Sequence, residues 1–142
     1  MTQRILAEQI ATVATSHTTV PPDVRAMLHR VTLDAFGLML AARQTHYIEA
    51  LKTSCLDQGA ATAFGHGSGF TVQDATLING TAVHGEDFDD TFEGTPVHVS
   101  SVIVPTMLAI AERENIPRDR LINAMAQGSE LICRLALVAP TA

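Results

Sequence analysis

The fold class follows from one long apolar segment, residues 21–42, which reads PPDVRAMLHRVTLDAFGLMLAA. Its two prolines and Asp23 are typical of a helix start, because proline suits the first turn and an acid suits the positive end of the helix dipole. Apolar residues then recur at helical spacing, with one stripe and a second set that widens it: Val24, Leu28, Val31, Ala35 and Leu38, then Leu33, Phe36 and Leu40. A helix that is apolar around most of its circumference is normally central in a bundle. We therefore expect this helix to pack against other helices of a helical bundle.

Five further helices are predicted along the chain from apolar periodicity and from proline, serine or threonine at their starts. They cover residues 3–16, 47–56, about 72 to 83 or beyond, a segment capped by Ser100 or Ser101, and a segment opened by Pro117. Residues 61–64 predict a short strand, and residues 65–69 predict a flexible glycine-rich turn. The expected fold is therefore all-α, bundle-like, with about six helices and one short strand or extended segment near 61–64.

Composition limits the classes of protein. The 142 residues suit a single domain, and 46% hydrophobic with 17% charged residues is a globular composition. The two cysteines, Cys55 and Cys133, are too few for an all-cysteine zinc site. We expect them to be free thiols in the reducing cytoplasm. No basic patch indicates nucleic-acid binding, and neither a signal peptide nor a membrane span is expected.

The acidic residues are concentrated in the middle of the chain. Between Lys52 and Arg113 there are eight acidic side chains and no Lys or Arg, within a chain of net charge −6. Clustered carboxylates repel one another, so this stretch needs a partner: solvent, a metal ion or cations from elsewhere.

One cluster within this stretch predicts chemistry: His84, the string Asp87-Phe88-Asp89-Asp90-Thr91, and His98. If helix geometry continues past Val83, His84, Asp87 and Thr91 share a face, Asp90 lies beside them and Asp89 points to the other side. Carboxylates beside imidazoles favour an acid–base site, because imidazole titrates near neutral pH. A solvated loop and a metal site stay open, although the spacing fits no standard zinc or EF-hand pattern.

These residues also carry a family resemblance. Asn79-Gly80, His84, residues 87–91 and His98, followed by Pro105, Leu108-Ala109 and Ala111-Glu112, resemble the MmgE/PrpD family. That family includes 2-methylcitrate dehydratase, cis-aconitate decarboxylase and iminodisuccinate epimerase. Residues 34–37 and 128–131 are similar to two further segments of the family.

The resemblance implies a helical domain that handles small di- or tricarboxylates without metal, cofactor or iron–sulfur cluster. It places catalytic roles on His98 in proton transfer, on Asp87 in substrate positioning or proton sharing, and on Thr91 in hydrogen bonding a carboxylate. His84 and Asp90 are expected to bind substrate. It further implies a cytoplasmic homodimer in propionate metabolism, and it implies that residues 1–142 are the N-terminal part of a longer protein with a second α+β domain.

The resemblance has departures. The family usually has His-Pro-Ser where this chain has His98-Val99-Ser100, and Ser129 replaces an aromatic residue. The site lysines of the family lie beyond this length.

The expected reaction is dehydration of a 2-methylcitrate-like hydroxy acid by acid–base catalysis, with decarboxylation or epimerisation as the alternative. A non-catalytic helical interaction module is the alternative of a different class.

Overall fold

The computed structural model describes residues 5–16 and 19–138, and it shows six helices and a two-stranded hairpin. The helices are α1 (Leu6–Ser16), α2 (Pro22–Ala42), α3 (His46–Ser54), α4 (Val72–His84), α5 (Val99–Glu114) and α6 (Arg118–Val138). The strands are β1 (Ala61–Ala63) and β2 (Gly67–Phe70). The all-α prediction is confirmed, and the predicted helix start at residue 3 lies outside the described residues.

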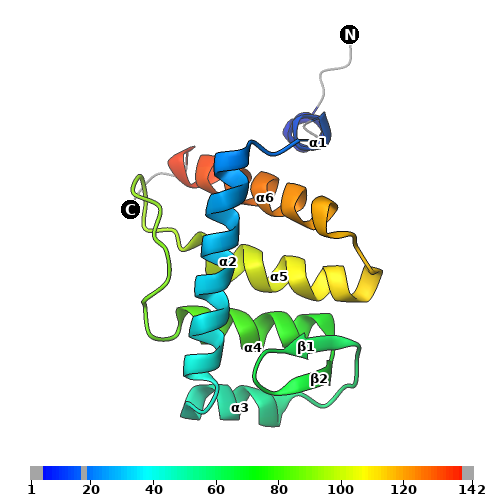
Figure 1. Ribbon diagram of the computed structural model, residues 1–142, viewed down its shortest axis with the longest axis vertical. Helices are drawn as coiled ribbons and strands as arrows, with labels where there is room; N and C mark the ends of the chain where they lie inside the picture. Colours follow the sequence, from blue (N-terminus) through cyan, green and yellow to red (C-terminus); the bar gives the residue numbers. More distant parts are fainter. Residues whose placement is uncertain (1–4, 17–18, 139–142) are drawn as a thin grey trace.

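Helices α4, α5 and α6 form a layer, and α2 crosses all three of them (Figure 1). The face of α2 toward this layer buries Ala35, Met39 and Ala42. Its other face is open, since Leu33 is 72% exposed. Helix α2 therefore contacts all three helices of the layer but covers only one side of it, and its additional apolar residues do not all enter the core.

The main core lies where α2 meets the layer. Its largest fully buried apolar side chains are Met39, Ile48, Ile78 and Val83, from three helices. The rings of Phe36 and Phe64 pack at a centroid distance of 4.4 Å and so join α2 to the end of β1. Burial of such side chains contributes about 1.5–3 kcal/mol each.

Residues 65–69 form part of a hairpin rather than a free turn. Strand β1 pairs antiparallel with β2, and Thr62 lies opposite Ser68. The hairpin is attached to α4 by Asn79, whose side chain is buried and accepts from the Phe64 N–H at 2.8 Å while donating to the Thr62 carbonyl at 2.9 Å. The second strand was missed because glycine-rich segments carry no strand periodicity.

Helix α4 begins with the predicted Thr71 cap. The Thr71 hydroxyl accepts from the Asp74 N–H at 3.1 Å and donates to the Asp74 carboxylate at 2.7 Å. The expected cap of α5 is wrong, because α5 begins at Val99, ahead of Ser100 and Ser101. The carboxylate of Asp90 instead accepts from the Ser100 N–H at 3.0 Å, so a side chain from the preceding loop satisfies this helix end.

One described helix, α6, has the length and mean hydropathy of a membrane-spanning helix, judged by length and composition alone. A single helix of this kind is weak evidence for a span. Glu130 and Arg134 lie within its apolar stretch, where charge is costly in a bilayer.

Candidate acid–base site

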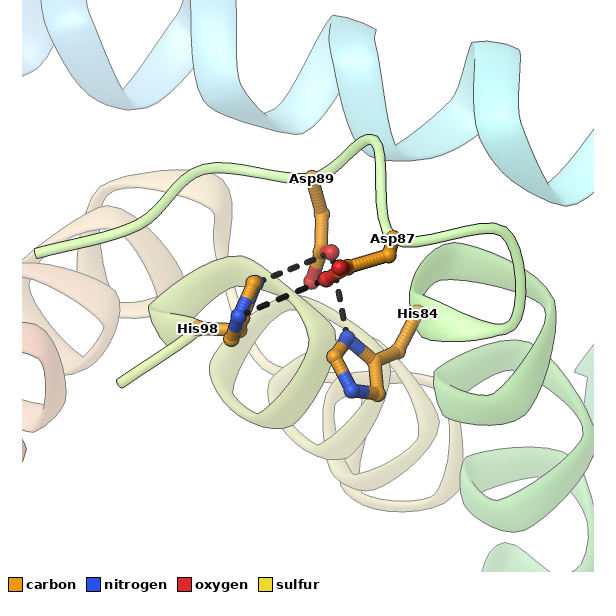
Figure 2. Close-up of side chains that lie close together, drawn as sticks. All are labelled: His84, Asp87, Asp89 and His98. Carbon is orange, nitrogen blue, oxygen red and sulfur yellow. Dashed lines mark hydrogen bonds and ion pairs between the residues drawn. The ribbon is translucent and has the colours of Figure 1, made fainter. Parts of the chain in front are cut away.

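The site lies where the C-terminal end of α4 meets the N-terminal end of α5. Gly80 permits the close approach of the two helices, because a Cβ at this position would lie 2.9 Å from the Ser101 carbonyl oxygen. Pro105, inside α5, has no N–H to offer that same carbonyl four residues before it. The close packing brings His84, the last residue of α4, beside His98, which precedes α5 (Figure 2).

Asp89 is the centre of the cluster (Figure 2). Its side chain is fully buried, and its Oδ1 lies 3.1 Å from Nδ1 of His84 and 3.1 Å from Nδ1 of His98. Its Oδ2 is buried and has no hydrogen-bond partner among the described residues. The two imidazole rings have centroids 4.5 Å apart and are tilted by 59°. One carboxylate therefore holds two histidines.

Asp87 approaches the second nitrogen of the His98 ring. Its Oδ1 lies 3.6 Å from His98 Nε2, and its side chain is 78% exposed. The backbone of Asp87 has a φ of +57°, a left-handed conformation that turns the chain directly after α4. His98 thus has a buried carboxylate at Nδ1 and an exposed carboxylate near Nε2.

The structure corrects the expected arrangement of this segment. Helix α4 ends at His84, so helical spacing does not continue through residues 87–91. Asp89, expected on the far side, is the residue that joins the histidines. Asp87 does approach His98, whereas Thr91 is exposed and makes no hydrogen bond to the cluster within the described ranges. The catalytic roles of Asp87, Thr91 and His98 stay predictions.

The two residues expected to bind substrate differ in their surroundings. His84 is about half exposed, with a side-chain exposure of 52%, so its ring can be reached from solvent. Asp90 uses Oδ1 to cap α5 through the Ser100 N–H. Its observed contact is structural, and its substrate role stays a prediction.

Sequence reasoning assigned no role to Asp89 because helical spacing placed its side chain on the side away from His84 and Asp87. Phe88 is 78% exposed, while Asp89 next to it is buried. Burial of a carboxylate costs free energy unless it is hydrogen bonded, and here its partners are imidazole nitrogens at the ends of two helices. The one available signal was the presence of two histidines flanking the acidic string at short range.

Cationic side chains do not reach this cluster in the described part of the chain. Arg113 lies at the opposite end of α5, about 22 Å from His98 by the rise of an α-helix, and it pairs with Glu114 at 2.7 Å. Arg134 pairs with Glu130 on α6, and Lys52 pairs with Glu49 on α3. An anionic substrate would have to obtain its counter-charges from elsewhere.

The arrangement supports two kinds of chemistry. Imidazole nitrogens near carboxylates can transfer protons at neutral pH. The same four residues, His84, Asp87, Asp89 and His98, offer ligand atoms within 4.8 Å of one another, which is a possible site for a divalent ion. Both Nδ1 atoms are already hydrogen bonded to Asp89, which satisfies them without an ion.

The fold and the site define a small helical domain that gathers imidazole and carboxylate groups at the junction of two helices. Residues 4–142 match the MmgE/PrpD N-terminal domain, so the chain belongs to the MmgE/PrpD family. A relative from Aspergillus oryzae, the cis-aconitate decarboxylase-like protein oryM, is 25% identical over 96 residues. These are 66% of this chain and 20% of the relative, so the match covers about a fifth of that protein. No solved structure matches the chain.

Proposed function

We propose that this domain supplies the acid–base groups of a metal-independent lyase that acts on small di- or tricarboxylates. The proposed reaction is dehydration of a 2-methylcitrate-like hydroxy acid. The observation that carries this proposal is the position of His98, held at Nδ1 by the buried Asp89 and approached at Nε2 by the exposed Asp87. Such a ring has one fixed nitrogen and one nitrogen available for proton transfer.

In the proposed dehydration, His98 Nε2 takes a proton from the carbon next to a substrate carboxylate. The electron pair of that C–H bond forms the new C=C bond. The hydroxyl group leaves as water after it takes a proton from the His98–Asp87 pair, which returns His98 to its neutral form. Asp87 positions the substrate or shares the proton, and the Thr91 hydroxyl donates to a substrate carboxylate. His84 and Asp90 complete the substrate contacts in this proposal.

The substrate's negative charges need cations that the described residues do not place at the site. Developing negative charge next to a carboxylate is stabilised by positioned donors and cations. We infer that these groups come from another part of a longer protein or from a second subunit of a cytoplasmic homodimer. Propionate metabolism is the corresponding proposed setting.

A second candidate reaction is decarboxylation, and the name of the Aspergillus relative favours it. Here a C–CO₂⁻ bond breaks, CO₂ leaves, and the remaining electron pair takes a proton from His98. Epimerisation uses the same proton abstraction, with the proton returned to the opposite face. A non-catalytic interaction module is the alternative outside enzymology, and the exposed apolar residues Leu137 and Val138 of α6 favour it.

The test is an ultraviolet assay of unsaturated-acid formation and consumption with the 142-residue chain and a panel of 2-methylcitrate, citrate and cis-aconitate. Product from 2-methylcitrate supports dehydration, and CO₂ release from cis-aconitate supports decarboxylation. Turnover should persist in EDTA, whereas loss in EDTA and recovery with a divalent ion would contradict the metal-independent mechanism. A folded chain without any turnover would contradict a complete site in this chain and favour a site that groups from outside these residues complete.

A further inference from the structure

A single buried carboxylate serves two imidazoles in this site. The Asp89 side chain is fully buried, while the side chains of His98 and His84 are 22% and 52% exposed. Both contacts are made by the same oxygen, Oδ1, at 3.1 Å. Proton transfer by His98 needs one anchored nitrogen, but it does not need the same carboxylate oxygen to contact His84 as well, so the shared contact calls for its own explanation.

The chemistry of the carboxylate fixes the direction of both hydrogen bonds. An ionised carboxylate can only accept, and one of its oxygens can accept two hydrogen bonds through its two lone pairs. Each Nδ1 must therefore carry a hydrogen and donate it. In a neutral ring, the hydrogen on Nδ1 leaves Nε2 as an unprotonated acceptor.

The second nitrogen of each ring is then free of the contact with Asp89. His98 Nε2 lies 3.6 Å from the exposed Asp87 carboxylate, which is too far for a hydrogen bond, and the His84 ring is half exposed. Figure 2 shows the two rings converging on Asp89 through their Nδ1 edges. A proton acceptor is thereby presented where a substrate can reach it, and the opposite edge of each ring is anchored.

We propose that Asp89 is a positioning residue that fixes both His84 and His98 in the Nδ1–H tautomer and leaves Nε2 of each ring as the proton acceptor. The inference rests on the proposed acid–base function for its effect on turnover. The tautomers themselves can be measured without any substrate, so the two proposals can fail separately.

The direct test is ¹⁵N–¹H NMR of the histidine side chains in the 142-residue chain, at a pH where the rings are neutral. His84→Gln and His98→Gln variants assign the two sets of signals. Both rings should show a hydrogen on Nδ1 and none on Nε2. An Nε2–H tautomer in either ring of the unaltered chain would overturn the proposal.

Asp89→Leu replaces the carboxylate by an apolar group of similar size and removes the acceptor from both rings. We expect both rings to lose the fixed Nδ1–H tautomer, and turnover, where the chain shows it, to fall by about 100-fold or more in kcat with KM little changed. Asp87→Asn is the matched control and should keep both Nδ1–H tautomers. Nδ1–H signals that persist in a folded Asp89→Leu chain would contradict the assignment. Turnover absent from the unaltered chain would count against a complete lyase site in these residues and would leave the tautomer assignment standing.

Discussion

His98 lies between two carboxylates of opposite burial, and this contrast defines its chemistry. Asp89 at Nδ1 is enclosed by protein, whereas Asp87 near Nε2 is open to solvent. A hydrogen bond in a low-dielectric interior is held more firmly than one at the surface. The ring is therefore anchored on one edge and adaptable on the other, as an acid–base group requires.

The first prediction concerns removal of the reacting groups. In any active form of the protein, His98→Ala and Asp87→Asn should abolish turnover, a loss of about 100-fold or more, because proton transfer and its partner are lost. Steady-state kinetics measure the loss, and circular dichroism should show unchanged helix content. His29→Ala, an exposed histidine on α2, is the control and should retain activity. Full activity in either site variant would contradict the assignment of that residue.

A second prediction at this scale concerns His66 in the hairpin. Burial lowers the pKa of the His66 imidazole, Lys52 lowers it further, and Glu49 partly opposes the shift. Its Nε2 is buried without a hydrogen-bond partner among the described residues. Since the pKa in the folded state lies below that in the unfolded state, the unfolded chain binds more protons as the pH falls, and stability decreases below about pH 6.5.

His66→Gln should therefore reduce the loss of stability between neutral pH and about pH 5.5. Urea unfolding at the two pH values measures the change. His29→Gln, on the exposed surface of α2, is the matched control and should leave the loss unchanged. An equal loss of stability in His66→Gln and in the unaltered chain would contradict the proposed effect of burial.

At the scale of elements, α4 organises the molecule through two adjacent residues. Asn79 binds the backbone of the hairpin through both the oxygen and the nitrogen of its side-chain amide, and Gly80 lets α5 approach closely. The Asn-Gly pair that carried part of the family resemblance thus has a structural explanation. It sets the position of α4 between the hairpin and α5, and so it sets where His84 meets His98.

A pair of identical substitutions tests this close contact. Gly80→Ala places a Cβ 2.9 Å from the Ser101 carbonyl oxygen, which must then move, so the variant should be destabilised by about 1–3 kcal/mol. Gly37→Ala on α2 meets nothing within 4 Å and should be stabilised by about 0.5–1 kcal/mol through helix propensity. Denaturant unfolding measures both. Equal effects of the two substitutions would contradict close packing of α4 on α5.

At the scale of the whole molecule, the end opposite the hairpin carries an open apolar groove. It has a volume of about 690 Å³ and lies between α1 and α6, where Ile10, Val13 and Leu131 are among its lining residues. Helix α1 buries no residue, and Leu135 and Val138 of α6 are 47% and 78% exposed. Apolar surface of this kind favours association.

We therefore expect the 142-residue chain to self-associate at high concentration. Light scattering over a concentration series measures the mass, and Leu135→Lys should shift the equilibrium toward monomer because it places a charge among exposed apolar side chains. Leu56→Lys is the control, since Leu56 is 89% exposed beyond α3 at the other end of the molecule. A monomer at every concentration would contradict this expectation.

Local patterns in the sequence determined the helices. Pro22 and Asp23 at the start of α2, the Thr71 cap of α4 and the apolar periodicity of each segment act within a few residues, so the helix count and the all-α class could be predicted. His84, Asp87 and His98 could be singled out because their side-chain types are suited to proton transfer. The second strand could not be predicted, because its pairing to β1 depends on a contact with Asn79 from another element.

Only the tertiary structure decided the role of Asp89. Helical spacing placed Asp89 away from the histidines. In the structure, however, helix α4 ends at His84, so that spacing does not apply to Asp89. The loop between α4 and α5 turns its carboxylate inward, where two N–H donors compensate for its burial, and leaves Phe88 outside. A charged group can be buried where hydrogen-bond donors surround it. Here His84 and His98 come together only because α4 and α5 pack closely, with Gly80 against the Ser101 carbonyl.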